Sequence, residues 1–319
     1  MGLRYETMLG KYIRGRKLGS GTYGTVYLAT DKNTGQDFAI KMVGINDNES
    51  CVPASTIREI GILLELNNFG CDNIIRIHEI IHKKRHISIV YELADWNLKE
   101  FMDRFAVKDL KNETLRRLPF ELTKSFLGQI LEGLIVCHKH SIIHRDLKPT
   151  NILITTYGIV KIADFGLSRT LSIPYRSLCH EVITLWYRAP EIMLGVQNYD
   201  YSVDVWSLGC IAYEMIQGKV LFPGDSEIGQ LYLIFEKLGT PTSDTWSGCE
   251  KLVNYNSELP KFKAIGFDEE KFTEDWKYII QNTICLNPME RIPLECIRVN
   301  TSVREKTIIP LQAYIDKTI

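Results

Sequence analysis

Four polar side chains close together in the sequence are suited to act on a phosphate ester. Asp146 offers a carboxylate that can accept a proton, and Lys148 adds a positive charge two residues later. Asn151 and Asp164 offer the hard oxygen atoms that Mg²⁺ prefers. Phosphoryl transfer requires a metal held against the phosphates and a hydroxyl held in line. The order of these groups is recognised as one used for phosphoryl transfer from ATP, with two candidate catalytic residues followed by two candidate magnesium ligands.

A glycine-rich segment of the G-x-G-x-x-G-x-V type precedes this set by more than a hundred residues. Missing side chains in such a loop let backbone N–H groups approach phosphate oxygens. The pattern alone also fits a structural hairpin or a dinucleotide-binding loop. Strands rather than a helix are expected after it, which argues against the dinucleotide fold. The candidate nucleotide-binding residues of this loop are Gly19, Gly21, Thr22, Tyr23, Gly24 and Val26.

Residues up to about position 90 are predicted to form short strands and one helix. The strands are expected at 12–18, 25–30, 38–43 and 87–91, where β-branched and aromatic residues lie between glycines and polar residues. A helix is expected after Pro53, because Ile57, Ile60 and Leu64 recur at helical spacing. Long amphipathic helices are then predicted at 121–140, 203–217, 230–238 and 275–286. The sequence therefore predicts an α+β protein with a small sheet lobe and a larger helical lobe.

Composition and charge limit the partners that can be expected. The chain has 319 residues, of which 45% are hydrophobic, and a formal charge of −1. This balance favours neither nucleic acid nor an anionic membrane as a partner. The eight cysteines are scattered without a C-x-x-C pair, so we expect reduced thiols in a cytoplasmic or nuclear protein. No apolar run is long enough for a membrane span, and no signal peptide is recognised.

The segments His144-Arg145-Asp146 and Asp164-Phe165-Gly166 resemble those of the eukaryotic protein kinases, and the resemblance covers roughly residues 12–300. The segment from Pro53 to Glu59 reads P-A-S-T-I-R-E, which is similar to a rearranged P-S-T-A-I-R-E helix of the cyclin-dependent kinases. Segments 180–191, 204–210 and 221–228 are similar to the same family. The T-x-Y sequence expected of mitogen-activated kinases does not occur between Asp164 and Glu191.

The resemblance implies further nucleotide-binding residues. Lys41, which follows Ala39 in a strand, would contact the α- and β-phosphates and be oriented by Glu59. Without the resemblance, each of these charges would be read as solvated. The implied hinge is Glu92-Leu93-Ala94, whose backbone would meet adenine. Leu153 completes the implied nucleotide site, which binds ATP together with Mg²⁺. Tyr91 stands where the family usually has phenylalanine, and Asn97 replaces the usual aspartate near the ribose.

Partner and substrate features are also implied by the resemblance. The Pro53–Glu59 helix would dock a cyclin-like regulatory subunit. Lys148 and Thr184 would mark specificity for serine and threonine in protein substrates. The segment carrying Val182, Thr184 and Arg188 resembles a pocket for proline directly after the target residue. Proline suits such a pocket because it has no backbone N–H to satisfy.

Regulation is expected at two places. Phosphate added to Thr22 or Tyr23 would repel the phosphates of ATP, unless Tyr23 only packs. Cys179 stands where the family commonly has an activating phosphothreonine, and cysteine cannot carry that phosphate. Partner contacts, a nearby acid such as Glu181, or phosphate on Ser177 is expected to replace it. The arginines that would normally gather the phosphate correspond to Arg58, Arg145 and Arg169.

The sequence thus predicts a bilobal protein kinase fold, with an ATP-binding lobe over 1–93 and a catalytic and substrate lobe with a short tail over 94–319. The function it implies is a cyclin-activated serine/threonine kinase in cell-cycle or transcription control. Two alternatives stay open, a pseudokinase scaffold and a cyclin-independent kinase of the same broad group. The intact set of Lys41, Glu59, Asp146, Asn151 and Asp164 argues against the scaffold.

Overall fold

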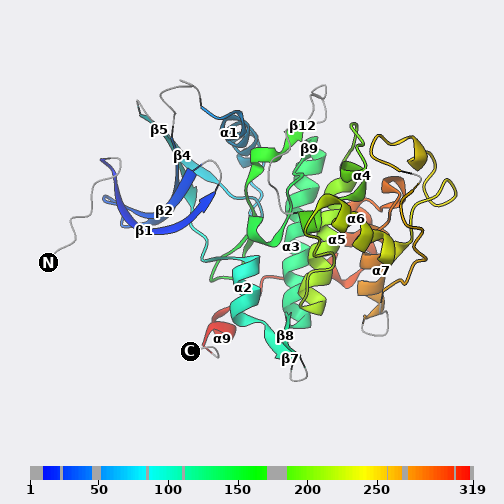
Figure 1. Ribbon diagram of the computed structural model, residues 1–319. Helices are drawn as coiled ribbons and strands as arrows, with labels where there is room; N and C mark the ends of the chain where they lie inside the picture. The colour runs from blue at the N-terminus through cyan, green and yellow to red at the C-terminus, as the bar shows by residue number, and fades with distance from the viewer. Residues whose placement is uncertain are drawn as a thin grey trace.

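The chain forms a small lobe built on a β-sheet and a larger lobe built on helices (Figure 1). The computed structural model describes residues 10–21, 24–44, 52–83, 86–109, 112–170, 185–256, 258–267, 272–304 and 307–316. This arrangement agrees with the predicted α+β, bilobal architecture.

The small lobe contains an antiparallel five-stranded sheet in the order β1-β2-β3-β5-β4. Its strands are β1 Tyr12–Gly21, β2 Gly24–Asp31, β3 Asp37–Gly44, β4 Ile77–Lys83 and β5 His86–Glu92. Helix α1, Ala54–Asn67, follows β3 and begins directly after Pro53, whose fixed φ suits a helix start. It buries Glu59 together with Ile62, Leu63 and Leu66. The helix therefore carries one acid among the apolar residues that it packs inward.

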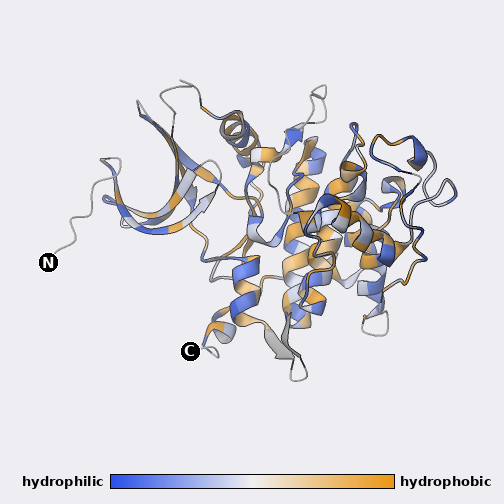
Figure 2. Cartoon of the chain, viewed as in Figure 1, coloured by the Kyte–Doolittle hydropathy of each residue, from blue (hydrophilic) through white to orange (hydrophobic). Residues whose placement is uncertain are grey.

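The large lobe is organised around α3, Phe120–Lys139, and α5, Ser202–Gln217. Almost every residue of α5 is buried, as expected for a helix at the centre of a lobe. Hydrophobic residues gather on these two helices (Figure 2). The other helices are α2 Leu98–Phe105, α4 Pro190–Met193, α6 Glu227–Leu238, α7 Glu274–Thr283, α8 Leu294–Asn300 and α9 Gln312–Ile315.

Short strands and turns between β5 and α4 carry most of the chemistry-bearing residues. The strands are β6 Trp96–Asn97, β9 Ile142–Ile143, β10 Ile152–Ile154, β11 Val160–Ile162 and β12 Arg169–Thr170. β11, β10 and β6 form one small sheet, and β12 pairs with β9. Single 3-10 turns occur at Pro149–Asn151 and Phe165–Leu167.

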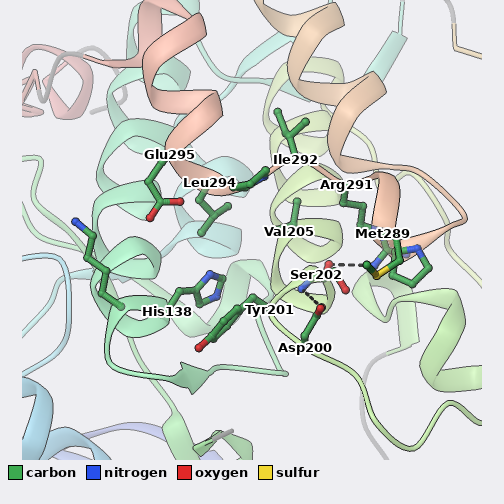
Figure 3. Close-up of a pocket in the computed structure, with 13 residues that line it drawn as sticks. His138, Asp200, Tyr201, Ser202, Val205, Met289, Arg291, Ile292, Leu294 and Glu295 are labelled. Atoms are coloured by element: carbon green, nitrogen blue, oxygen red, sulfur yellow. Dashed lines mark hydrogen bonds between the residues drawn. The ribbon is translucent and has the colours of Figure 1, made fainter.

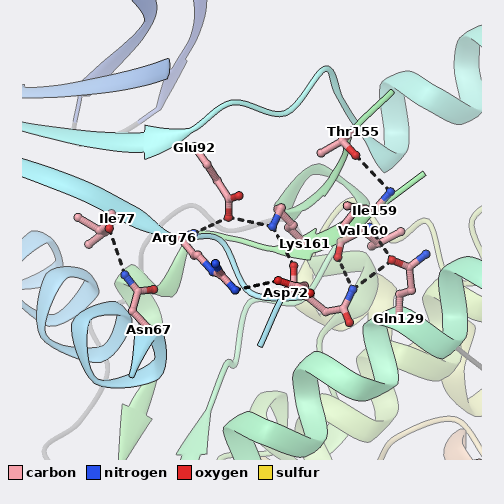
Figure 4. Close-up of polar contacts among 11 residues, drawn as sticks. Asn67, Asp72, Arg76, Ile77, Glu92, Gln129, Thr155, Ile159, Val160 and Lys161 are labelled. Carbon is pink, nitrogen blue, oxygen red and sulfur yellow. Dashed lines mark hydrogen bonds and ion pairs between the residues drawn. The ribbon is translucent and has the colours of Figure 1, made fainter. Parts of the chain in front are cut away.

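A polar network joins the two lobes beside the end of β5 (Figure 4). Asn73 Nδ2 donates to Gln129 Oε1 of α3 at 3.1 Å. Lys161 Nζ of β11 lies 2.9 Å from Glu92 Oε1 and donates to the Asp72 carbonyl at 2.8 Å. Lys161 is buried, so its charge needs these oxygen partners. The network fixes the end of β5 relative to the helical lobe.

Several elements differ from the sequence-based expectation. β4 was not predicted as a separate strand, because His78 and His82 interrupt its apolar pattern. A hairpin of β7 Val107–Asp109 and β8 Asn112–Arg117 occupies the long connection before α3. α6 begins three residues earlier than expected, where the Ser226 side chain accepts from Gly229 N at 3.1 Å. α7 ends at Thr283 rather than at 286, with Ile284 outside helical geometry and Pro288 close behind.

Candidate active site

A buried carboxylate, that of Asp204 in α5, holds the start of the segment between β9 and β10. Its oxygens accept the backbone N–H groups of His144 and Arg145, each at 2.8 Å, and His138 Nε2 lies 2.9 Å away. Burial favours a raised pKa, but the contacts with His138 and the His144 N–H bring the pKa of Asp204 below its ordinary value. Arg145 has φ 67, a backbone conformation that costs about 1–3 kcal/mol outside glycine. Asp204 offsets this cost.

Asp146 lies in this segment, and its carboxylate contacts Lys148 and Asn151. Lys148 Nζ donates to Asp146 Oδ2 at 2.7 Å, and Asn151 Nδ2 donates to the same oxygen at 3.0 Å. Asn151 Nδ2 also donates to the Asp146 carbonyl at 2.8 Å, which the 3-10 turn at Pro149–Asn151 makes possible. Three of the four residues singled out first in the sequence therefore meet at one carboxylate.

His144 is fully buried and contacts backbone and ring atoms. Its Nε2 lies 3.0 Å from the Ala163 carbonyl, and its ring packs edge-on against Phe165 with the centroids 4.9 Å apart. Its own carbonyl accepts from Ser168 Oγ at 3.1 Å. These contacts tie the segment before Asp146 to the segment around Asp164.

Lys41 of β3 and Glu59 of α1 form the ion pair that the sequence predicts. Lys41 Nζ lies 2.7 Å from Glu59 Oε2, with the Glu59 side chain 5% exposed. The other oxygen, Oε1, accepts from the hydroxyl of Tyr91 at 2.7 Å. A buried carboxylate is stable only when its oxygens have partners, and both oxygens of Glu59 have one.

Asn151 and Asp164 present a donor set that fits a hard divalent cation. Both side-chain hydrogen bonds that Asn151 makes to described residues use Nδ2, so its carbonyl oxygen is the atom that it could offer to a metal. Asp164 has a positive φ of 63°. Its Oδ1 lies close to Gly166, since a Cβ added at that glycine would be 3.4 Å from this oxygen. Within the described ranges, no three or more His, Cys, Asp or Glu side chains form a metal site. Mg²⁺ is commonly held by one or two carboxylates plus substrate phosphates, so this two-residue set fits it.

The glycine-rich segment forms the end of the β1–β2 hairpin. Gly19 pairs with Val26, and Gly21 pairs with Gly24. A Cβ added at Gly24 would lie 2.3 Å from the Met42 carbonyl of β3, so only glycine fits there. Val26 also pairs with Lys41, which places the hairpin beside the lysine. The two other predicted residues of the loop, Thr22 and Tyr23, lie outside the described residues.

The predicted hinge begins at Glu92, the last residue of β5. The N–H of Glu92 donates to the Arg76 carbonyl at 3.2 Å, so this N–H is already engaged. Ala94 lies between β5 and β6, and Leu153 of β10 pairs with Asn97 of β6. Asn97 Oδ1 caps α2 by accepting from Glu100 N at 2.9 Å. The amide NH₂ of Asn97 is therefore the group that it can offer to a ribose hydroxyl.

Two of the three predicted phosphate-site arginines bind backbone carbonyls. Arg58 Nη1 donates to Gly166 O at 2.7 Å, and Arg145 Nε donates to Leu167 O at 2.6 Å. Arg145 Nη2 also contacts Leu167 O, and its Nη1 donates to the Tyr199 hydroxyl at 2.6 Å. Burial, followed by the nearby arginines, lowers the pKa of Arg145 below its ordinary value.

The third arginine, Arg169, lies in β12 and pairs with Ile143 of β9. Cys179 and Ser177 are the two regulatory positions expected near these arginines. Both lie outside the described residues.

The predicted substrate pocket is described only in part. Arg188 Nη1 lies 3.2 Å from Glu227 Oε1 at the start of α6. Nearby, Trp186 Nε1 donates to the Gly224 carbonyl at 2.9 Å, which joins the same two segments. Val182 and Thr184, the other pocket residues, lie outside the described residues.

Two bracing groups had no assigned role in the sequence analysis. Asp204 was noted only as part of a family-like segment. Arg291 forms a two-pronged ion pair with Glu191, with N–O distances of 2.5 Å and 2.7 Å, and both side chains are buried. Removing one partner of such a pair strongly destabilises the fold, because the other charge is left buried and unpaired. A buried arginine far from its acid leaves no local pattern in the sequence, so no sequence signal could have found it.

A separate cavity of about 370 Å³ lies between the end of α3, the start of α5 and residues 288–295 (Figure 3). His138, Tyr201, Met289 and Glu295 are among the residues that line it. The cavity includes none of the predicted catalytic, metal or nucleotide residues. It is therefore distinct from the site around Asp146.

Comparison with known families was made for the whole chain. A family model described as protein kinase domain matches residues 12–300. The matched range contains every predicted catalytic, metal and nucleotide residue. Among the described helices, none is long and apolar enough to cross a lipid bilayer.

Proposed function

This chain belongs to the protein kinase domain family, and we propose that it is a cyclin-activated serine/threonine kinase. Membership of the family supports phosphoryl transfer to proteins, with ATP and a divalent metal in general. The finer assignment rests on the residues described above and on the resemblance of residues 53–59 to the cyclin-dependent kinases. We place the protein in the cytoplasm, the nucleus or both, in cell-cycle or transcription control.

The observation that carries the proposal is the arrangement around Asp146. Both side-chain contacts of Asp146 found among the described residues fall on Oδ2, which leaves Oδ1 to accept or orient the proton of a substrate hydroxyl. Lys148 lies beside the same carboxylate and is suited to neutralise the transferred phosphate. Asn151 and Asp164 would hold Mg²⁺, which supplies charge neutralisation on the phosphates when bound. Lys41, oriented by Glu59, would hold the α- and β-phosphates.

The face of α1 supports a cyclin-like partner. Ile57 is 60% exposed and Leu64 is 46% exposed, and residues seven apart lie on one side of a helix. Arg58, next to Ile57, donates to the Gly166 carbonyl beside Asp164. A partner that covers the apolar face would therefore act on a helix that contacts the metal-binding segment.

We also propose that activation does not require a phosphate at position 179. Arg58 and Arg145 already donate to the carbonyls of Gly166 and Leu167, and Arg145 has the Tyr199 hydroxyl as a further partner. Such bonds satisfy guanidinium groups that a phosphate would otherwise gather. Assays before and after complete phosphatase treatment test this, together with Ser177→Ala. Loss of activity in either case would move the activating role to another phosphosite.

The proposed specificity is tested with matched peptides. Peptides containing Ser-Pro or Thr-Pro are expected to be phosphorylated in preference to otherwise identical peptides with alanine after the target residue. A tyrosine peptide serves as the negative control. Equal rates for the proline and alanine peptides would contradict the pocket assigned to Val182, Thr184 and Arg188.

The partner is tested by purifying the chain under native conditions and identifying what accompanies it. A cyclin-like subunit that raises the transfer rate is the expected result. Transfer without any partner would favour a cyclin-independent kinase. Absence of transfer with the partner and Mg²⁺ present would favour a scaffold.

A further inference from the structure

Tyr91 is placed by the sheet to face both Lys41 and helix α1. It pairs with Ala39 across β3 and β5, and Lys41 stands two residues farther along β3. Side chains two residues apart on a strand lie on the same face of a sheet. The phenol and the lysine amine therefore approach Glu59 of α1 from two neighbouring strands.

Glu59 contacts one residue of each strand, Lys41 of β3 and Tyr91 of β5. Oε2 lies 2.7 Å from Lys41 Nζ, and Oε1 accepts from Tyr91 Oη at 2.7 Å. Glu59 is 4% exposed and Tyr91 is 8% exposed, so the carboxylate and the phenol are shielded from bulk water. The residue next to Tyr91 is Glu92, which Lys161 holds to the helical lobe. The phenol thus links α1 to the end of the sheet that Lys161 ties to the helical lobe.

The phenol keeps its proton at ordinary pH and donates it to the Glu59 carboxylate. Burial, and then the negative charge of Glu59, raises the pKa of Tyr91 well above its ordinary value, and Asp164 acts in the same direction. A neutral hydroxyl that donates to a carboxylate forms one of the stronger classes of hydrogen bond. Phenylalanine has the same ring and lacks this donor.

We propose that Tyr91 is a positioning residue that holds Glu59, and with it α1, in the place where Glu59 pairs with Lys41. The consequence for transfer rests on the proposed kinase function, whereas the restraint on the helix does not. In this role Tyr91 touches neither the phosphates nor the substrate, and acts through Glu59. An internal anchor of this kind lowers the share of helix positioning that a partner must supply.

The direct test is amide hydrogen exchange of α1 in the full-length protein, compared between the parent and Tyr91→Phe. Exchange around Glu59 is expected to quicken by roughly tenfold to a hundredfold, the factor that follows from losing a hydrogen bond to a charged group. Tyr187→Phe is the matched control, because Tyr187 makes a similar buried bond to Glu214 Oε2 at 2.5 Å in the large lobe. It should leave exchange in α1 unchanged.

A double-mutant cycle with Glu59→Leu, which removes both carboxylate oxygens, separates positioning from packing. If Tyr91 acts through the carboxylate, Tyr91→Phe has a much smaller effect on α1 exchange when Glu59 is already leucine. An equal effect in both backgrounds, or unchanged exchange in Tyr91→Phe alone, would overturn the proposal. Hydrogen exchange needs no turnover, so this result stands apart from any failure of the proposed kinase function.

A kinetic readout accompanies the exchange data. Since Glu59 orients Lys41, Tyr91→Phe is expected to raise KM for ATP more than it lowers kcat at saturating ATP. A general loss of stability would instead lower the fraction of active enzyme and leave KM unchanged. Tyr91 would be a core residue alone if Tyr91→Phe left KM for ATP unchanged and Tyr187→Phe also quickened amide exchange in α1.

Discussion

Replacing Asp204 by asparagine is expected to disable the segment that carries Asp146. The two oxygens of Asp204 accept the N–H groups of Arg145 and His144, each at 2.8 Å. Asparagine keeps one oxygen and turns an NH₂ group toward a second N–H donor. The segment therefore loses a hydrogen bond to a charged group and leaves a buried donor unsatisfied.

The size of the effect follows from these two changes. A hydrogen bond to a charged group contributes about 1.5–3 kcal/mol, and an unsatisfied buried donor costs about 1–3 kcal/mol. Each 1.36 kcal/mol corresponds to about a tenfold change in rate. If about 3 kcal/mol falls on the placement of Asp146, kcat falls roughly a hundredfold. The free energy of unfolding should fall by a similar amount, which a domain with about 5–15 kcal/mol of stability tolerates.

The assay combines steady-state phosphorylation of a protein substrate with urea unfolding. Asp200→Asn is the control, because Asp200 is exposed and uses one oxygen to accept from Ser202 N at 2.9 Å. It should change neither quantity appreciably. The reasoning would be refuted if Asp204→Asn kept kcat within about threefold of the parent and unfolded at the same urea concentration, since the bonds to His144 and Arg145 would then carry no energy.

Three further outcomes are expected. Burial raises the pKa of Tyr187 above its ordinary value of 10, so its contribution to stability is complete below pH 10 and is lost as the pH rises further. Urea unfolding at pH 9, 10 and 11 should show a shallower alkaline loss for Tyr187→Phe than for the parent; parallel losses would contradict this. Arg291→Met leaves the Glu191 carboxylate buried and unpaired, and should lower the free energy of unfolding by about 3–5 kcal/mol, whereas an unchanged value would mean that the pair is not buried in solution. Gly24→Ala should weaken ATP binding in a nucleotide titration, because its Cβ would clash with the carbonyl of Met42; parental affinity would show that the hairpin shifts freely.

Elements with a strong local pattern could be predicted from the sequence. The helix expected at 121–140 is α3, Phe120–Lys139, and the strands expected at 12–18, 25–30 and 38–43 lie within β1, β2 and β3. Long periodic segments and runs of β-branched residues indicate their secondary structure from the local sequence alone. β4 and the β7–β8 hairpin were missed because their residues mix polar and apolar types without a clear period.

The grouping of the candidate site was also accessible from the sequence, through motif spacing and family resemblance. Asp146, Lys148 and Asn151 lie within six residues and meet at one carboxylate, and the expected contact of Lys41 with Glu59 is present. The roles assigned to these residues remain predictions for experiment.

What holds the site in place was not predictable. Asp204 lies 59 and 60 residues from the N–H groups that it binds, and Arg291 lies 100 residues from Glu191. Such pairs depend on the packing of α5 and its neighbours, which no local spacing reveals. The Tyr91 hydroxyl is similar, because a tyrosine in a strand is first read as core. Its contact with Glu59 becomes visible only when β5 and α1 are placed together.

The measurement that tests the central claim most directly is phosphoryl transfer from ATP by Asp146→Asn beside the parent, both with Mg²⁺ and the co-purified partner. Asparagine keeps the shape of the side chain and cannot accept the hydroxyl proton. The parent is expected to label serine and threonine, and the variant to turn over about 10²–10⁴-fold more slowly while binding ATP normally. Equal rates for the two proteins would contradict the assignment of Asp146, and no transfer by either would favour a scaffold.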